Sequence, residues 1–311
     1  MAINWFPGHM HKARKEIKKV MPQMDLIIEV VDARLPFSSE NPLVPALRGD
    51  TPVIKVLNKR DLADPAITEQ WLGWLEKERG VRAITMTHNQ RAEALDILRL
   101  AGEMTPDHDR QKRALRVMIL GIPNVGKSTL INTMAGRPAA KTGNEPAVTR
   151  AQQAIKLPDN VLLYDTPGFL WPKLSPEACG YRLAISGAIR SAVIEFEDVA
   201  LFEADYLLDA YPELAMARYG FEERPRDGLA LMDGIAEKRR FLGRGGVPDL
   251  HKVSEILLNE FRSGKLGRIS LETPAMVEQE AREEAERQRE KSDKAWSSLP
   301  QRHTLNHPPA T

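Results

Sequence analysis

The sequence predicts an α/β fold: a mostly parallel, doubly wound sheet followed by a small all-helical domain. Short apolar runs alternate with helical stretches over the first half of the chain, which is typical of parallel strands joined by helices. Two later runs are separated only by Pro-Asp-Asn, so we expect a hairpin and one antiparallel edge strand. From about Ser175 onward the strand pattern fades and helical patterns remain, which predicts the second domain.

The predicted strands are short apolar runs, and most of them stop at a polar residue or a glycine. They cover residues 26–31, 52–57, 81–86 and 116–120, and the hairpin covers 151–157 and 161–165. Helices are predicted at 67–79 and 94–104, with a polar linker at 105–115. Because ligands of doubly wound sheets bind beyond the carboxyl ends of the strands, the residues after each run are candidates for a binding site.

Two amphipathic helices mark the second domain. In residues 227–241 the apolar face carries Leu229, Met232 and Ile235, and residues 249–261 repeat the pattern. Residues 277–294 carry seven acidic and five basic residues, which favours a solvated helix or a disordered tail. The predicted domains are residues 1–174, residues 175–275 and a charged, mobile tail at 276–311.

Composition excludes several classes of protein. The 311 residues include 44 Lys and Arg against 43 Asp and Glu, so a globally basic coat protein for nucleic acid is excluded, whereas local basic patches are not. The single cysteine, Cys179, excludes an internal disulfide framework. No run approaches about 18 apolar residues, and the start has no signal-peptide core. We therefore expect a soluble, cytoplasmic protein.

The segment GIPNVGKS (121–128) matches G-x-x-x-x-G-K-S/T between a predicted strand and a predicted helix, the context that a P-loop needs. Its glycines let the backbone wrap a phosphate. Lys127 is expected to reach the β- and γ-phosphates, and the Ser128 hydroxyl to bind Mg²⁺. The alternative is a chance match in an unrelated loop. The expected phosphate contacts are Asn124, Val125, Gly126, Lys127, Ser128 and Thr129.

The segment NKRD (58–61) follows the run 52–57 and predicts which base is bound. The Asp61 carboxylate can accept from N1–H and the exocyclic amine of guanine, and adenine has neither donor there. Asn58 is expected to touch the other purine edge and brace the P-loop, and the Lys59 stem to cover the base. Four residues alone could form a solvated turn, but with the P-loop they predict a guanine nucleotide.

The segment DTPG (165–168) completes the site. Asp165 is expected to hold Mg²⁺ through water, and the Gly168 N–H to meet the γ-phosphate. Thr149 is the preferred second Mg²⁺-binding hydroxyl, with Thr142 as its rival. Residues 85–89, TMTHN, are expected to give backbone contacts only.

The order of these motifs is unusual, because NKRD precedes the P-loop. This order, the start WFPGHMHKA, the segment VDARLP (31–36) and DTPGFLWPK (165–173) resemble the circularly permuted ribosome biogenesis GTPase A (YlqF/RbgA) family, over residues 1 to about 275. The resemblance implies a circularly permuted P-loop GTPase domain. It also implies a monomeric GTP hydrolase that binds the precursor of the large (50S) ribosomal subunit and its rRNA with GTP, and leaves on hydrolysis.

Under this resemblance, basic patches would contact rRNA through phosphates. The alternative for each patch is a solvated face. The first patch is Lys12, Arg14, Lys15, Lys18 and Lys19, the second is Lys238, Arg239 and Arg240, and a weaker third is Arg262, Lys265 and Arg268.

Another residue must orient the attacking water, because Phe169 stands where many GTPases carry a glutamine after DxxG. A phenyl ring cannot orient water, so hydrolysis should be slow without the ribosomal particle. The resemblance suggests His9 as the substitute, and local packing or RNA contact is its alternative. Asn124 resembles the asparagine that binds K⁺ in potassium-activated GTPases, although it could simply brace the loop. The predicted catalytic set is His9, Lys127, Thr149 and Gly168.

Two other functions share some of these motifs. An RNA-binding assembly factor that uses GTP as a structural ligand would carry all of them and show negligible turnover. A P-loop phosphotransferase for a small molecule would carry the P-loop, but the NKRD segment argues against it.

Overall fold

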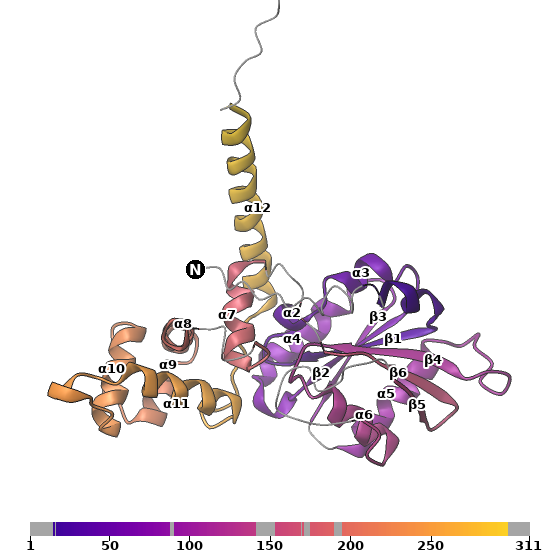
Figure 1. Ribbon diagram of the computed structural model, residues 1–311, viewed down its shortest axis with the longest axis horizontal. Coiled ribbons are helices and arrows are strands. Elements are labelled where there is room, and N and C mark those ends of the chain that lie inside the picture. Colours follow the sequence, from indigo (N-terminus) through magenta and orange to yellow (C-terminus); the bar gives the residue numbers. More distant parts are fainter. Residues whose placement is uncertain are drawn as a thin grey trace, which may run out of the picture.

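The computed structural model describes residues 15, 17–87, 90–140, 153–168, 170, 175–189 and 195–297. These residues form a six-stranded sheet with helices around it and a group of helices to one side (Figure 1). The predicted α/β class, with a mostly parallel sheet and a helical part after it, is confirmed. Among the described residues, no helix combines the length and apolar character needed to cross a membrane.

The sheet has the order β3-β2-β1-β4-β6-β5. All neighbouring pairs are parallel except β5 and β6, which form the predicted antiparallel hairpin at the edge. The strands are β1 (Leu26–Asp32), β2 (Val53–Asn58), β3 (Val81–Met86), β4 (Leu115–Gly121), β5 (Gln153–Leu157) and β6 (Val161–Asp165).

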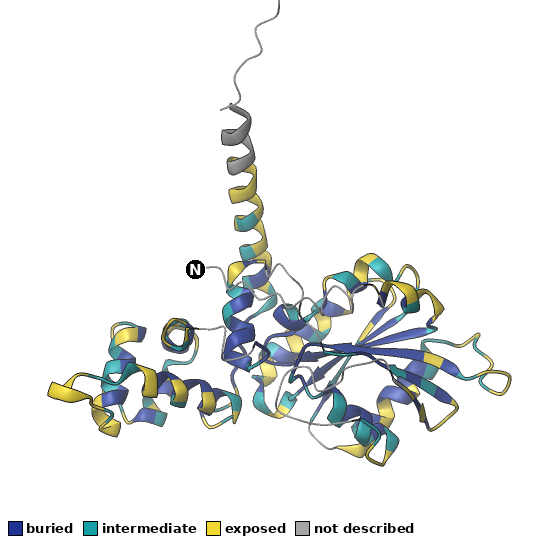
Figure 2. Cartoon of the chain, in the orientation of Figure 1, coloured by how far each residue is buried: buried dark blue, intermediate teal, exposed yellow. Residues whose placement is uncertain are grey.

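The central strands are buried on both faces, because helices cover both sides of the sheet (Figure 2). Every residue of β1 and of β2 is buried, which explains why both are mainly apolar in the sequence; two charged exceptions, Glu29 and Lys55, lie 3.5 Å apart. The covering helices are α2 (Pro36–Ser39), α3 (Leu43–Leu47), α4 (Pro65–Leu75), α5 (Arg91–Glu103) and α6 (Lys127–Ala135).

Helix α4 is shorter than the sequence predicts. The Asp64 side chain caps it by accepting from Ala66 N at 2.8 Å, and the helix ends at Leu75 rather than at residue 79. Turns then lead to Gly80, whose φ of 75° favours glycine, and β3 follows directly.

The helical part lies beside the sheet, and its helices pack mainly through α8 and α11 (Figure 1). The predicted helices at 227–241 and 249–261 are present, each capped by an aspartate side chain. Leu229 is a correction, because it is 43% exposed while Met232 and Ile235 are buried. The helices are α7 (Glu177–Ser186), α8 (Phe196–Ala210), α9 (Pro212–Tyr219), α10 (Gly228–Arg239), α11 (Leu250–Arg262) and α12 (Pro274–Ser297).

Helix α12 projects away from the rest of the molecule (Figure 1), and only its beginning is packed. Val277 is buried, and Trp74 Nε1 donates to Glu278 Oε1 at 2.8 Å. Of the two structures expected for the charged segment, the described residues form the helix.

The linker at 105–115 joins α5 to β4 and is fixed through Asp25, just before β1. Arg113 Nη2 lies 2.7 Å from Asp25 Oδ1, and Arg116 N donates to Asp25 Oδ2 at 2.9 Å. This linker connects the first three strands in the sequence, β1 to β3, to β4, which lies next to β1 in the sheet.

Candidate functional site

Four functional segments meet at one edge of the sheet, because their strands are parallel. Strands β1, β2, β4 and β6 end at Asp32, Asn58, Gly121 and Asp165 respectively. The residues beyond these ends are the VDARLP segment, NKRD, the P-loop and DTPG. The structure therefore brings the predicted motifs together although they are far apart in the sequence.

The P-loop wraps the space between β4 and the start of α6. Gly126 precedes α6 with φ 94°, and a Cβ there would collide with the Asn58 side chain amide. A Cβ at Gly121 would lie 3.0 Å from Val30 O. Both glycines are thus required by close packing, and the first turn of α6 turns its N–H groups toward the loop as an anion site.

Lys127 and Asp165 form a buried ion pair at the floor of the site. Both side chains are nearly inaccessible, and Lys127 Nζ donates to Asp165 Oδ1. Burial lowers the pKa of Lys127, and Asp165 opposes that shift. The pair places a positive charge for phosphates beside a carboxylate for a metal ion.

The donor set fits Mg²⁺. The ion prefers oxygen ligands and usually keeps several waters beside one or two protein groups and phosphates. Ser128, in the first turn of α6, supplies a hydroxyl, and Asp165 supplies a buried carboxylate. These are the two described residues that would hold the ion.

The NKRD segment is held from two sides. Asn58 Nδ2 donates to Val125 O at 2.8 Å, which is the expected brace to the P-loop. Lys59 has left-handed backbone, φ 62°, and its ammonium lies 2.8 Å from Asp32 Oδ2. Asp61 is exposed, as a carboxylate that receives a ligand must be.

The described part of DTPG lies against the P-loop. Thr166 Oγ1 donates to Ile119 O at 2.8 Å, and a Cβ on Gly168 would come within 3.3 Å of Pro123 N. Gly168 therefore lies next to the phosphate loop, as its predicted role requires.

Asn124 connects the P-loop to the helical part. Its φ is 59°, and its Nδ2 donates to Gly187 O, just after α7, at 2.9 Å. The side-chain oxygen is the group that a cation would use.

Several predicted residues lie outside the described residues: His9, Lys12, Arg14, Thr142, Thr149 and Phe169. Of the basic patches, Lys15, Lys18, Lys19, Lys238, Arg239 and Arg240 are exposed. Two residues of the third patch are used within the protein. Arg262 donates to Ala184 O and Ile185 O, both at 2.8 Å, and Arg268 Nε donates to Ala63 O at 3.0 Å.

Sequence reasoning assigned no role to Asp32 and Arg34, which the structure places behind Lys59. The signal was the position of VDARLP directly after an apolar run, where a buried aspartate at a strand end can act on a neighbouring strand end.

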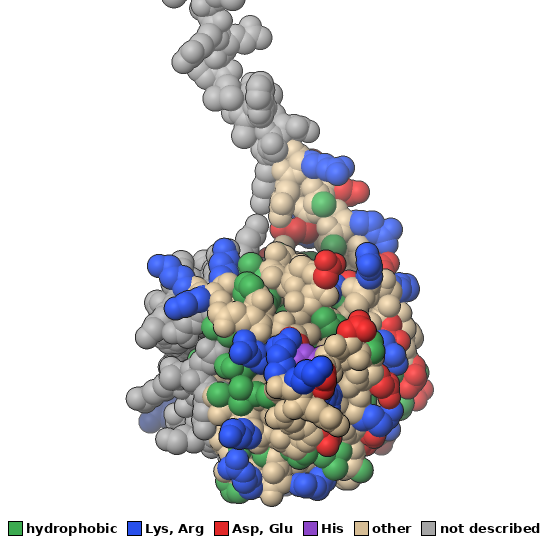
Figure 3. Space-filling model, turned by 90° about the vertical axis from the view of Figure 1, so that its right-hand side faces the viewer, with side chains coloured by type: hydrophobic (Ala, Val, Ile, Leu, Met, Phe, Trp, Pro, Cys, Tyr) green, Lys and Arg blue, Asp and Glu red, His purple; other side chains and the backbone are tan. Residues whose placement is uncertain are grey.

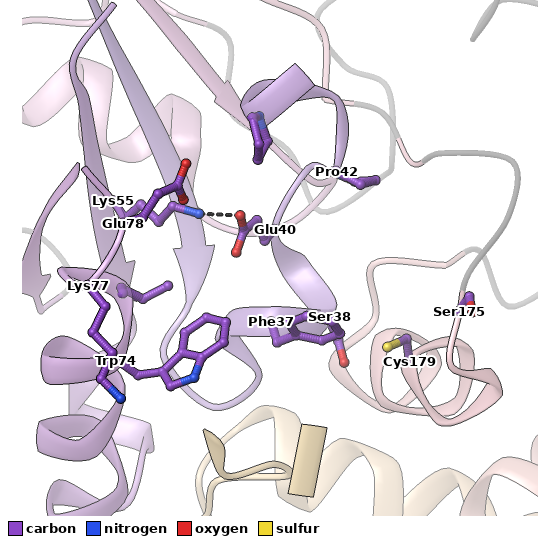
Figure 4. A pocket seen from close by; sticks show the side chains of 12 residues that line it. Phe37, Ser38, Glu40, Pro42, Lys55, Trp74, Lys77, Glu78, Ser175 and Cys179 are labelled. Atoms are coloured by element: carbon purple, nitrogen blue, oxygen red, sulfur yellow. Dashed lines mark ion pairs between the residues drawn. The ribbon is translucent and has the colours of Figure 1, made fainter. Parts of the chain in front are cut away.

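A separate pocket of about 670 Å³ lies between α2, α4 and α7 and contains none of the predicted nucleotide contacts (Figure 4). It includes the ion pair of Lys55 with Glu40, drawn as a dashed line. Lys55 Nζ also lies 3.5 Å from Oε2 of the buried Glu29, so its ammonium neutralises a carboxylate inside the sheet.

A P-loop on a central strand, a guanine loop on a nearby strand and a buried aspartate opposite the P-loop lysine define a P-loop GTPase, and this protein is one. A family model described as 50S ribosome-binding GTPase matches residues 116–220. P-loop GTPases generally use Mg²⁺.

Similar proteins identify the family of P-loop GTPases to which the chain belongs. Ribosome biogenesis GTPase A of Priestia megaterium is 42% identical over 90% of this chain and 99% of its own length. The protein of the same name from Bacillus cereus is 43% identical over 88% of this chain and 95% of its own length. The chain belongs to the ribosome biogenesis GTPase A family.

Solved structures agree with this assignment. GNP-bound YlqF from T. maritima is similar with a TM-score of 0.60 and 30% identity, over 85% of this chain and 98% of that one. The GDP-bound structure of TM YlqF has the same TM-score and identity, over 84% of this chain and 99% of that one.

Proposed function

We propose that this GTPase acts late in assembly of the large ribosomal subunit, in the cytoplasm and as a monomer. It binds the precursor particle and its rRNA with GTP and leaves after hydrolysis. The observation that carries the proposal is the meeting of the P-loop, NKRD and DTPG at one sheet edge, in a chain that spans 99% of a relative named for ribosome biogenesis. The description of the matching family model supports the large subunit as partner.

In this proposal each side of the site has its own task. Asn58, Lys59 and Asp61 bind guanine, and residues 124–129 bind the phosphates. Ser128, Asp165 and Thr149 hold Mg²⁺, which would add positive charge beside the β- and γ-phosphates when bound. The buried Lys127 reaches the same phosphates, and the Gly168 N–H donates to the γ-phosphate. The ion pair of Lys127 with Asp165 supports this division of charge.

Hydrolysis transfers the γ-phosphoryl group of GTP to water and releases GDP, so the attacking water must be oriented. His9 is proposed to accept a hydrogen bond from that water once the particle is bound. The support is chemical, because Phe169 cannot accept one.

The switch is proposed to link the two parts of the chain, residues 1–174 and 175–275. GTP orders the Thr149 loop and DTPG, and this favours the form that binds the particle. The contact of Asn124 with Gly187, at the end of α7, supports a link between phosphates and helices.

RNA contact is proposed for two basic patches, Lys12–Lys19 and Lys238–Arg240. Ile17 is buried, whereas Lys15, Lys18 and Lys19 are exposed, so one side of this segment is anchored and the other presents charge. Figure 3 shows the face opposite the helical part, which does not include Lys238–Arg240; Lys and Arg side chains lie in its middle, at its left and at its bottom, and most Asp and Glu side chains lie to the right. Charge is thus patched locally although the net charge is only +1.

The test is GTP turnover in KCl with and without purified large subunits. Particles should raise turnover strongly, and His9→Ala should reduce the stimulated rate about a hundredfold, because one positioned base is lost. His251→Ala, an exposed histidine on α11, is the matched control and should respond as the wild type does. Turnover that ignores the particle would detach the site from the ribosome, and full stimulation of His9→Ala would remove His9 from the mechanism.

Potassium is proposed as a further cofactor, bound by the Asn124 side-chain oxygen. Replacing KCl with NaCl should lower turnover about tenfold, since positive charge near the phosphates is lost. Asn124→Ala should turn over equally in the two salts. Equal rates of the wild type in both salts would contradict the proposal.

A further inference from the structure

The VDARLP segment runs alongside the guanine loop. Asp32 is paired in register with Asn58 at the ends of β1 and β2, and Ala33 N donates to Asn58 O at 2.8 Å. The backbone of NKRD therefore begins against the backbone of this segment.

A buried carboxylate then holds the guanine-loop lysine. Asp32 is fully buried, and its Oδ2 accepts from Lys59 Nζ and from Arg34 Nη2, both at 2.8 Å. Its Oδ1 accepts from Arg34 Nε at 2.9 Å. These two cations hold the pKa of Asp32 far below its usual value, against the effect of burial. Asp32 is thus a permanent anion that fixes the end of the Lys59 side chain.

Arg34 is fixed in turn by the helical part of the chain. Its Nη1 donates to Phe261 O at 3.2 Å, and its guanidinium lies 4.5 Å from the centre of the Phe261 ring. Its own carbonyl accepts from Leu271 N at 2.6 Å. With 1% of its side chain exposed, Arg34 has one geometry available, set by Asp32 on one side and by α11 on the other.

The residues after Asp61 are held by the non-helical segment that follows α11. Leu62 O accepts from Ile269 N at 3.0 Å, and Ala63 O accepts from Arg268 Nε at 3.0 Å. Gly264 lies so close to Leu62 that a Cβ would come within 2.6 Å of its side chain. Both the lysine and the aspartate of NKRD are therefore supported from residues beyond 260.

We propose that Arg34 is a positioning residue for base recognition, which fixes Lys59 through Asp32 and makes the helical part of the chain a structural component of the guanine loop. Arg34 acts at a distance from the ligand: its planar guanidinium reaches both carboxylate oxygens and Phe261 O at once, and a lysine has no such fork. This inference rests on the proposed roles of Lys59 and Asp61 in binding the base, and it needs no ribosomal partner.

The test compares the affinities of Arg34→Lys for GDP and IDP, the diphosphate whose base lacks the exocyclic amine. The variant keeps the charge but loses the fork, so its Kd for GDP should rise about tenfold and its preference for GDP over IDP should fall. Arg48→Lys is the matched control. Arg48 is also nearly buried and bonds a carboxylate and carbonyls, Glu78 at 2.8 Å and Thr51 O at 3.1 Å, but at the opposite ends of the strands. Its substitution should leave the preference intact.

A double-mutant cycle with Lys59→Met tests the route. If Arg34 acts through Lys59, Arg34→Lys should change GDP affinity much less in the Lys59→Met background than in the wild type. Additive effects would overturn this route.

The preference of the wild type for GDP over IDP distinguishes failure of the base-binding roles of NKRD from failure of the role of Arg34. A wild type that binds GDP and IDP equally would overturn the base-binding roles of NKRD and with them this inference. A wild-type preference that Arg34→Lys retains would overturn only the role of Arg34. Should Arg34→Lys fail to fold, Phe261→Leu decides, because it removes the ring under the guanidinium and keeps an apolar side chain. It must shift the preference in the same direction, and an unchanged preference overturns the proposal.

Discussion

At the scale of single residues, Glu203 on α8 is a buried acid whose carboxylate oxygens have no hydrogen-bond partner among the described residues. Burial raises its pKa to about 8, Glu260 adds to the shift, and Arg262 and Arg34 oppose it. The guanidinium of Arg262 donates to the end of α7, and that of Arg34 donates to Asp32. Glu203 is therefore neutral in the folded protein near neutral pH, and the helical part carries an acid that prefers its proton.

This raised pKa predicts how stability depends on pH. In the unfolded chain Glu203 ionises near 4.5, whereas in the folded protein it ionises near 8. Between these values the folded state binds more protons, so this group makes the free energy of unfolding fall as pH rises, by at most about 1.4 kcal/mol per pH unit. Above pH 8 its contribution is constant.

Glu203→Gln removes this titration, so the difference in free energy of unfolding between variant and wild type should grow in favour of the variant from pH 5 to pH 8. Urea unfolding at four pH values measures it. Glu255→Gln, at an exposed glutamate on α11, is the control and should follow the wild type. Parallel curves for Glu203→Gln and the wild type would show that Glu203 is not protonated in the fold.

At the scale of elements, the sequence predicts those parts whose pattern has one physical cause. Strands β1 and β2 begin and end within one residue of the predicted runs, because a strand buried on both faces is mainly apolar. The P-loop, NKRD and DTPG were predicted at one edge because parallel strands share their carboxyl ends. Thus most of the sheet and the described core of the candidate site follow from local patterns.

Features that depend on contacts between distant parts of the chain were not predictable in the same way. The buried face of α10, which packs on α8, was predicted to include Leu229, but Leu229 is exposed and Leu231 is buried instead. The contact of Arg34 with Phe261 joins residues 227 positions apart. No periodicity in VDARLP indicates that a charged side chain there will be buried by a helix so far along the chain.

At the scale of the whole molecule, the sheet and the helices share one hydrophobic core. A single cluster of buried residues includes Ile28 and Leu120 in the sheet, Leu183 on α7 and Leu257 on α11. Hydrogen bonds cross the same boundary, because Trp71 Nε1 donates to Glu272 O at 3.1 Å and Ser38 N donates to Glu272 Oε1 at 3.0 Å. Because apolar packing and hydrogen bonds cross together, a ligand that stabilises the guanine loop should also stabilise the helical side.

Amide hydrogen exchange can detect this coupling at two reporters. Ile269 N and Leu271 N donate across the boundary to Leu62 O and Arg34 O, so their exchange requires that boundary to open. GDP should slow both amides about tenfold, because binding stabilises the closed form of the loop that they support. The amide of Gly243, bonded to Val247 O at 2.8 Å within the α10–α11 loop, lies away from the boundary and should exchange at the same rate with and without GDP. Protection confined to the P-loop would mean that the two parts open independently. Slowing at residues 269 and 271 alone, among the amides beyond residue 175, would place the coupling at the guanine loop.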